Sequence, residues 1–227
     1  MVIPDGVTSI AQNAFSGCSG LKSVTIPNSV KSIGNGAFSN CSGMTSVTIP
    51  NSVTTIGGGA FEYCPNLTSI AIPSGVTDIG YGAFSNCYGL TSVTIPNSVT
   101  FIVTKAFFGC TGLTSVTCEA TSVPSTGWYV FDGVPQSIAT LYVPESALED
   151  YKATEPWSGF GNIVAIGSEP TLRGDVNGDG VVNGTDIQAI INLIVEGEYD
   201  EKADVNEDEQ VNGTDIQEVI NIIVEGE

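Results

Sequence analysis

The chain has 227 residues, enough for one large domain or two smaller ones, with a net charge of −19 and no histidine. Six basic side chains cannot neutralise an array of phosphates, which excludes a general affinity for nucleic acids or anionic membranes. The absence of histidine excludes Ser-His and Cys-His catalytic pairs. The carboxylates of the first part of the chain share no register, so we expect no enzyme.

The charge is unevenly distributed along the chain. Residues 171–227 hold 15 of the 25 acidic side chains against two basic ones, a net charge of −13, and such a break predicts a domain boundary. The sequence has no apolar run of about 18 residues or more, so we expect no membrane-spanning segment. Because the chain begins inside a repeat unit, we expect further sequence upstream in the natural protein, including a targeting segment.

A 23-residue repeat fills the first half of the chain. Ile-Pro recurs at 3–4, 26–27, 49–50, 72–73 and 95–96, and Ala-Phe at 14–15, 37–38, 60–61, 83–84 and 106–107. Within a unit, the β-branched "SVTI" predicts a short strand and "PNS" predicts a turn. The other inward positions of one unit are Val30, Ile33, Ala37, Phe38 and Cys41. One unit cannot bury so many apolar groups, so successive units are expected to stack into a solenoid.

Units such as "LTSVTIPNSVTTIGGGAFEYC" resemble the leucine-rich repeats of the BspA-like (Treponema pallidum type) family. The resemblance covers residues 1–117 and implies a leucine-rich-repeat solenoid of short parallel strands. Residues 118–167 lose the period and resemble the C-terminal cap of that family, which is needed because the last repeat would otherwise expose its apolar end face. Six aromatic residues are expected to fill the cap: Trp128, Phe131, Tyr142, Tyr151, Trp157 and Phe160.

Five of the six cysteines also recur with the period of the repeat, at positions 18, 41, 64, 87 and 110. Side chains in register on parallel strands stack about 5 Å apart and point the same way, whereas a disulfide needs Cβ atoms about 3.8 Å apart on converging vectors. We therefore expect a column of small buried thiols, with disulfides or a metal site as the alternatives. Cys118 lies outside this column, and the sequence leaves its state open.

Two sets of outward side chains could form a recognition surface on the solenoid. Hydroxyl side chains dominate the outward strand positions. A regular row of hydroxyl groups could bind a glycan or a flat lattice, but Ser and Thr are also common on any solvated strand. These positions are Ser23, Ser46, Ser69, Ser92, Ser115, Thr25, Thr48, Ala71, Thr94 and Thr117. The repeat units differ in sequence mainly at Tyr63, Tyr81, Tyr88, Phe101, Lys105 and Phe108. Such variation is expected of a recognition surface on a loop face, but random sequence drift would also produce it. The ligand, protein or glycan, stays open.

Two acidic stretches near the end of the chain, "DVNGDGVVNGTD" (175–186, the first loop) and "DVNEDEQVNGTD" (204–215, the second loop), have the spacing of calcium-binding loops. Oxygen ligands are expected at loop positions 1, 3, 5, 7, 9 and 12, and such hard ligands favour Ca²⁺. The first loop supplies Asp175, Asn177, Asp179, the Val181 carbonyl, Asn183 and Asp186. The second supplies Asp204, Asn206, Asp208, the Gln210 carbonyl, Asn212 and Asp215. The sequence thus predicts two Ca²⁺ ions.

Each loop is followed by a predicted helix but not preceded by one, because "GSEPTLRG" before the first loop has no helical period. Gly180 stands at the sixth place of the first loop, where the chain turns sharply, and Glu209 stands there in the second. A side chain in a left-handed conformation is unfavourable, so we expect the second site to be weaker or distorted. We also expect this acidic module to unfold without metal, since its carboxylates repel one another.

The duplicated loop-helix units resemble dockerin domains, the calcium-loaded modules that bind cohesins in cellulosome-like assemblies. The resemblance implies a small all-α domain over 174–227 that contacts a cohesin through loop positions 10 and 11 and an exposed helix face. The positions implied are Gly184, Thr185, Gln188, Ile191, Asn192, Gly213, Thr214, Gln217, Ile220 and Asn221. The chain has Gly-Thr and Ile-Asn where many dockerins have Ser-Thr and basic residues. For Ile191 and Ile220, packing between the two helices is the alternative.

The predicted organisation is therefore a repeat region (1–117), a cap (118–167), a linker (168–173) and a dockerin (174–227). It implies an extracellular or cell-surface, non-catalytic scaffold or adhesion protein of a bacterium, whose solenoid recognises a protein or surface and whose calcium-dependent dockerin binds a cohesin partner. In the alternative, the calcium sites are purely structural and no cohesin is bound.

Overall fold

The computed structural model describes residues 1–167, 173–177 and 181–225, and the chain divides into two compact units, Met1–Gly167 and Ser168–Glu227. The finer segment boundaries predicted from the sequence remain a prediction. Among the described residues no helix is both long and apolar enough to cross a membrane.

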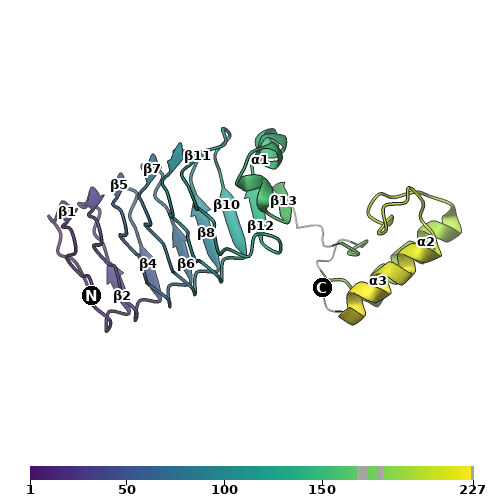
Figure 1. Ribbon diagram of the computed structural model, residues 1–227, viewed down its shortest axis with the longest axis horizontal. Coiled ribbons are helices and arrows are strands. Elements are labelled where there is room, and N and C mark those ends of the chain that lie inside the picture. Colours follow the sequence, from purple (N-terminus) through teal and green to yellow (C-terminus); the bar gives the residue numbers. More distant parts are fainter. Residues whose placement is uncertain (168–172, 178–180, 226–227) are drawn as a thin grey trace. The chain divides into compact units, whose positions relative to one another are not determined.

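The first unit is a solenoid in which each repeat contributes two short parallel strands (Figure 1). The predicted "SVT" strands lie on one side, where neighbouring repeats pair in register, as Val24 does with Val47, except that the strands at 46–48 and 69–71 are not paired with each other. They are β2 (Ser23–Thr25), β4 (Ser46–Thr48), β6 (Ser69–Ala71), β8 (Ser92–Ile95) and β10 (Ser115–Cys118), continued by β12 (Thr140–Val143) and β13 (Asn162–Ala165). The leucine-rich-repeat solenoid of short parallel strands is therefore confirmed.

A second sheet, which the sequence did not predict, runs along another side of the solenoid. Its strands are β1 (Ser9–Ile10), β3 (Ser32–Ile33), β5 (Thr55–Ile56), β7 (Asp78–Ile79), β9 (Phe101–Ile102) and β11 (Ser125–Thr126). Strands this short do not show an alternating pattern, so they cannot be read from the sequence. The pairing itself comes from the neighbouring turn, for example Ile56 against Ile79.

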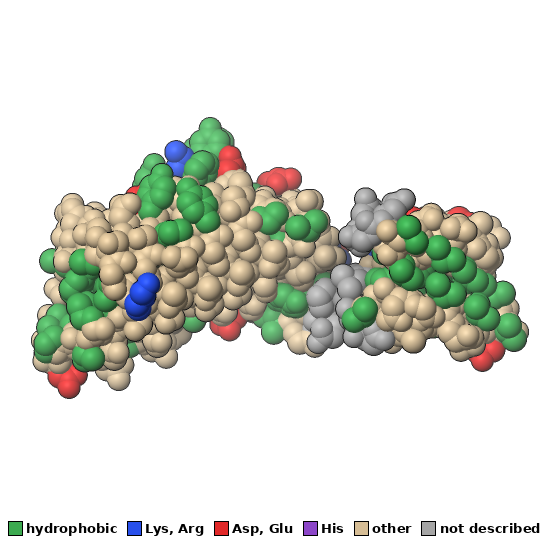
Figure 2. All heavy atoms as spheres, turned by 90° about the horizontal axis from the view of Figure 1, so that it is seen from below, with side chains coloured by type: hydrophobic (Ala, Val, Ile, Leu, Met, Phe, Trp, Pro, Cys, Tyr) green, Lys and Arg blue, Asp and Glu red, His purple; other side chains and the backbone are tan. Residues whose placement is uncertain are grey.

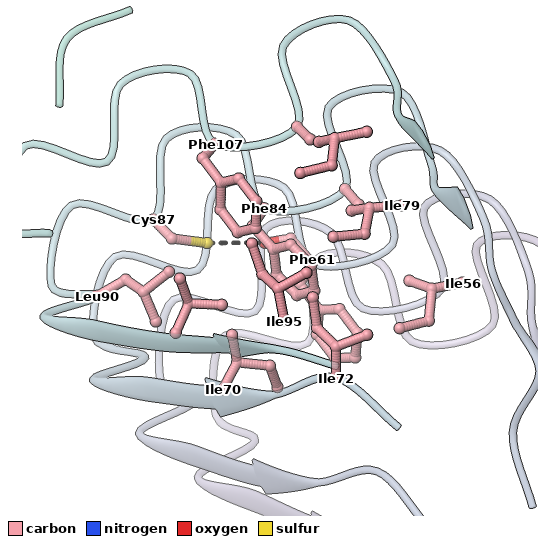
Figure 3. Packing of buried hydrophobic residues seen from close by; sticks show 14 of the residues in the cluster. Ile56, Phe61, Ile70, Ile72, Ile79, Phe84, Cys87, Leu90, Ile95 and Phe107 are labelled. Atoms are coloured by element: carbon pink, nitrogen blue, oxygen red, sulfur yellow. Dashed lines mark hydrogen bonds between the residues drawn. The ribbon is translucent and has the colours of Figure 1, made fainter. Parts of the chain in front are cut away.

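The core of the solenoid is a column of stacked rings beside a column of thiols. Figure 3 shows Phe61, Phe84 and Phe107 of the first column and Cys87 of the second. Phe15, Phe38, Phe61, Phe84 and Phe107 stack with centroids 5.2–5.6 Å apart and interplanar angles of 5–10°. Each buried cysteine of the column donates its Sγ–H to a phenylalanine carbonyl of the preceding turn, as Cys87 does to Phe61 at 3.1 Å. The stacking predicted from the repeat period is thus confirmed.

The cap closes the end of the solenoid with edge-to-face aromatic contacts. It contains a 3₁₀ turn η1 (Glu145–Ala147), α1 (Leu148–Ala153) and a second 3₁₀ turn η2 (Trp157–Gly159). Buried Trp157 contacts Phe131 and Tyr151 at 5.2 and 5.3 Å between ring centroids, and its Nε1–H donates to the Pro124 carbonyl. Because these rings cover the last Phe of the column, the apolar end face is not left open to water.

One predicted cap residue, Trp128, does not belong to the cap core: its side chain is 78% exposed. Tyr142 is only half-buried, whereas Phe131, Tyr151, Trp157 and Phe160 are buried as expected. The prediction for Trp128 was wrong because residue 128 continues an outward turn column of the repeats. The Lys105 N–H donates to its carbonyl just as the Gly82 N–H donates to that of Thr104.

The second unit contains α2 (Gly184–Glu196) and α3 (Gly213–Glu225), each of which begins at the tenth residue of its loop. Its small core is formed by Ile190, Ala203, Val205 and Val219, with partly buried aliphatic residues around them. Residues 197–203, ahead of the second loop, form turns and no helix. The loop-plus-exit-helix organisation expected from the sequence is thus present in the second copy, and α2 begins at the equivalent place of the first loop.

Candidate functional site

The twelfth residue of each loop is a fully buried carboxylate that bridges the two ends of its loop. Asp186 accepts hydrogen bonds from the N–H groups of Asn177 (3.1 Å) and Asn183 (2.8 Å). Asp215 accepts the equivalent bonds from Asn206 (3.2 Å) and Asn212 (2.9 Å). Asp186 thereby completes a capping box with Asn183 at the start of α2. A short Asp at this place therefore ties the loop to the first turn of the helix.

The other carboxylates of the second loop face the loop backbone. Asp204 accepts from the N–H groups of Asp208 (2.9 Å) and Glu209 (2.8 Å), and the Tyr199 hydroxyl also donates to it (3.1 Å). Asp208 accepts from the Gln210 N–H at 3.0 Å. Hydrogen bonds from backbone donors hold the carboxylates in one tight turn.

The eleventh residue of each loop couples the loop to the surface. The Thr185 hydroxyl accepts from Asn177 Nδ2 at 2.7 Å and donates to Asn183 Oδ1 at 3.0 Å. In the second copy, Thr214 makes the same two bonds, to Asn206 at 2.7 Å and to Asn212 at 2.9 Å. Both threonines are exposed. The sequence predicted them only as residues that contact a partner. It did not predict that their hydroxyl groups also form hydrogen bonds with the asparagines of the loop.

The donor set of the loops suits a hard cation. It consists only of carboxylate, amide and backbone oxygens. The ion pairs among the described residues join Lys152 with Glu149 and Arg173 with Glu218, so neither Asp186 nor Asp215 has a basic side-chain partner among them. Residues 173–177 and 181–225 bring no three His, Cys, Asp or Glu side chains into a group that could hold a metal by themselves. Asp179 lies outside the described residues. The calcium ligands thus remain a prediction, based on spacing and donor chemistry.

Glu209 adopts a positive φ of 63°, in the left-handed region as the sequence predicted. Glu207, at the fourth place of the second loop, also has a positive φ of 61°. The sequence holds glycine at both equivalent places of the first loop, Gly178 and Gly180, which lie outside the described residues. The second loop therefore carries backbone strain at two positions where the first has glycine.

The predicted contact residues lie on the surface in both copies. Ile191 and Ile220 are each 37% exposed and lie outside the apolar core, so the alternative that they pack between the helices is wrong. Gly184, Thr185, Gln188, Asn192, Gly213, Thr214 and Gln217 are exposed or partly exposed, and Asn221 is half-buried. In each copy the glutamine donates to the asparagine one helical turn later, at 3.0 and 3.1 Å.

The apolar part of this face is larger than the sequence predicted. Ile194, Val195, Ile223 and Val224 are exposed in addition to Ile191 and Ile220, so the two helices expose the same three positions each. Figure 2 shows hydrophobic side chains gathered on the surface of this unit. The sequence alone does not identify these further residues as exposed, because an apolar pattern that covers most of a helix does not show which side is buried. The duplication of the loop-helix unit is the signal in the sequence that could have identified these exposed apolar positions, because both copies have them.

On the solenoid, the column of outward Ser and Thr residues follows the strands, exposed at Ser23, Ser46 and Ser69 and half-buried at Ser92 and Ser115. The variable aromatics lie elsewhere: Tyr63, Tyr81, Tyr88 and Phe101 are exposed. Lys105 Nζ lies 5.3 Å from the centroid of the Phe108 ring. Single exposed rings and exposed hydroxyls both occur on ordinary protein surfaces, so both sets of residues remain predictions as recognition surfaces.

All six cysteines are free thiols, five buried and Cys18 exposed, so the disulfide alternative is wrong. Burial raises the pKa of Cys110 to about 12 and that of Cys64 and Cys87 further. Cys118, which the sequence left open, accepts a hydrogen bond from the Tyr151 hydroxyl at 3.1 Å. The buried thiols are core atoms and poor nucleophiles, because the thiolate is the reactive form.

Each unit also matches a known protein family. A model described as BspA type leucine-rich repeat region matches residues 1–114 and 77–152, in six copies, and one described as dockerin type I domain matches residues 173–224. No curated protein is significantly similar to the chain.

Several solved structures are similar to this chain, including two that match it with a TM-score above 0.5. A leucine-rich repeat protein of T. pallidum is 31% identical with a TM-score of 0.54, and the match covers 61% of this chain and 78% of that one. The pneumococcal vaccine antigen PcpA is 20% identical with a TM-score of 0.58 over 73% of this chain, and the match spans only 40% of that antigen. The second likeness is one of fold alone.

Proposed function

Since the chain belongs to the BspA-type leucine-rich repeat family and carries a dockerin type I domain, we propose that it is a non-catalytic scaffold or adhesion protein. Both families are binding modules. The solenoid recognises a protein or surface ligand, and the dockerin attaches the chain to a cohesin-type module in the presence of calcium. Because such domains are typical of secreted and surface proteins, we place the protein outside the cell or on its surface.

The observation that carries this proposal is the duplicated exposed face beside the loops. Two helices present the same threonine, glutamine, isoleucine and asparagine, and each threonine is bonded to its own loop. A purely structural calcium site needs the buried Asp186 and Asp215, but it does not need the same six apolar side chains exposed. Repeated exposed isoleucine and valine on a small acidic domain is typical of a docking surface.

Calcium would be held by the predicted oxygen ligands of each loop, where it would neutralise carboxylates and fix the loop backbone. The residues of the chain would then transmit the fixed loop geometry to the helices. Asp186 and Asp215 tie each loop to its helix, and the threonine bonded to the loop lies at the start of the exposed face. Metal in the loop therefore stabilises the orientation of the docking helix.

The proposal is tested by capture on immobilised type I cohesins in calcium and in chelator. Binding in calcium that is lost on chelation is expected. Because there are two equivalent faces, Ile191→Glu or Ile220→Glu alone should weaken binding only a few-fold, whereas the double variant should abolish it. Lys202→Glu changes the charge of an exposed side chain that belongs to neither set of predicted contact residues; it is the matched control and should bind normally.

A second candidate function keeps the calcium sites but makes them purely structural. The capping box at the start of α2 and the hydrogen bonds within each loop favour this alternative, because they stabilise helices with or without a partner. Calcium-dependent folding of a chain that no cohesin captures would support it and contradict the first proposal.

A further inference from the structure

A cavity of about 620 Å³ opens on the solenoid surface near the cap. Phe101, Trp128 and Tyr129 supply aromatic rings to its lining, and Asp132, Gln136 and Glu155 supply polar groups. The three rings are 36%, 78% and 56% exposed, respectively. Figure 2 shows hydrophobic side chains projecting from one edge of the solenoid, next to both acidic and basic side chains. A cavity of this size and mixed lining is typical of a ligand site.

The two most exposed rings occupy consecutive positions in the turn columns of the repeats. The Lys105 N–H donates to the Trp128 carbonyl at 3.0 Å, continuing a ladder in which the Gly59 N–H donates to Tyr81 and the Gly82 N–H to Thr104. Trp128 thus stands in the column of Tyr81 and Thr104. The residue after it, Tyr129, stands in the column that earlier repeats fill with Asn13, Gly36, Gly59, Gly82 and Lys105.

Tyr129 has a φ of 61°, which glycine adopts readily and an aromatic residue does not. The equivalent places in earlier repeats hold Gly36, Gly59 and Gly82, and also Asn13 and Lys105 with φ of 56° and 63°. The left-handed conformation therefore belongs to the whole column, and the backbone itself does not require a tyrosine here. A bulky side chain kept in a strained, exposed conformation at the mouth of a cavity suggests a role in binding.

The charge of the cavity is negative. The carboxylates of Asp132 and Glu155 line it, and none of the described Lys or Arg residues does. The nearest basic residue along the ladder, Lys105, has its Nζ over the Phe108 ring and is not part of the lining. Gln136 donates to the Pro156 carbonyl at 2.9 Å, which holds the rim next to Glu155 in place. Aromatic faces with carboxylates and no base favour a cation.

We propose that this cavity binds an arginine-bearing peptide segment of a protein partner. A guanidinium can stack flat on an indole or phenol ring and at the same time donate to a carboxylate, which an ammonium does less well. The volume exceeds that of a single side chain, so residues flanking the arginine also enter. The inference rests on the proposed role of the solenoid in recognition, and it specifies the chemistry of the ligand.

The test uses the full chain with excess calcium, a fluorescent capped peptide of glycine, serine and two arginines, and anisotropy at about 150 mM salt to suppress non-specific attraction. Trp128→Ala and Tyr129→Gly should each weaken binding about ten-fold, and Asp132→Asn with Glu155→Gln about five-fold or more. Tyr129→Gly introduces the residue that three earlier repeats have at this place (Gly36, Gly59 and Gly82), so its melting temperature should not fall.

The matched control is Tyr81→Ala, which removes an equally exposed ring from the same turn columns but outside the cavity. This variant should bind the peptide normally, and a lysine version of the peptide should bind more weakly. Unchanged binding by Trp128→Ala, or an equal loss in Tyr81→Ala, overturns the proposal. So does binding of chitohexaose, a neutral glycan, by a chain that ignores the peptide. No cohesin is present, so failure of the docking proposal leaves this result unaffected.

Discussion

Glu209 illustrates how one residue can set the properties of a whole loop. Its backbone lies in the left-handed region, where a Cβ is unfavourable, and its N–H donates to Asp204. The backbone of Tyr129 on the solenoid also lies in the left-handed region. At the scale of single residues, both of these side chains in the left-handed region lie at sites to which we assign a function, the second calcium loop and the peptide cavity.

We expect Glu209→Gly to tighten calcium binding in the second loop. Removing the side chain relieves about 1–2 kcal/mol of strain, which corresponds to a gain of about five- to thirty-fold in affinity. Calorimetric titration of both sites measures it. Glu209→Gln is the control, because it removes the charge and keeps the strain, and should not tighten binding. Two equally tight sites in the unaltered chain would contradict the strain argument.

Among the elements, the solenoid is stabilised by columns rather than by individual strands. Phe84 lies between Phe61 and Phe107 at 5.6 and 5.5 Å, whereas Phe15 has one ring neighbour and is only half-buried. Strands as short as these have little stability of their own, so each turn depends on the turns on both sides.

Phe84→Ala should therefore cost about 3–5 kcal/mol, because it leaves a cavity in the middle of the column. Phe15→Ala, at the open end of the column, should cost clearly less. Urea unfolding followed by circular dichroism compares the two through their midpoints. Equal losses would mean that the column does not act as a continuous core.

Across the chain as a whole, the two units have separate cores, and only the core of the second unit adjoins buried carboxylates. The solenoid core within residues 1–167 is apolar and holds no buried ionised group, whereas the core of the second unit is small and adjoins the buried carboxylates of Asp186 and Asp215. Burying a carboxylate without a basic partner is unfavourable unless it is hydrogen-bonded or binds a cation.

Chelation should accordingly unfold the second unit and leave the solenoid intact. Circular dichroism should lose its helical signal while the strand signal persists, since metal-binding energy becomes folding energy in such a module. A chain with Asp186→Asn and Asp215→Asn is the comparison, and its helical signal should respond less to added calcium. If the helices persist in chelator, folding and calcium binding are not coupled.

The features that repeat could be predicted from the amino-acid sequence alone. The period of the first half predicted the stacked Phe and Cys columns, and the duplicated acidic stretches predicted two loops with exit helices, because each signal is local and recurs. The second sheet, the outward position of Trp128 and the exposure of Ile191 and Ile220 became apparent only in the folded chain. They depend on which neighbour supplies the facing hydrogen bond or covers a helix side, and no pattern within one short segment carries that information.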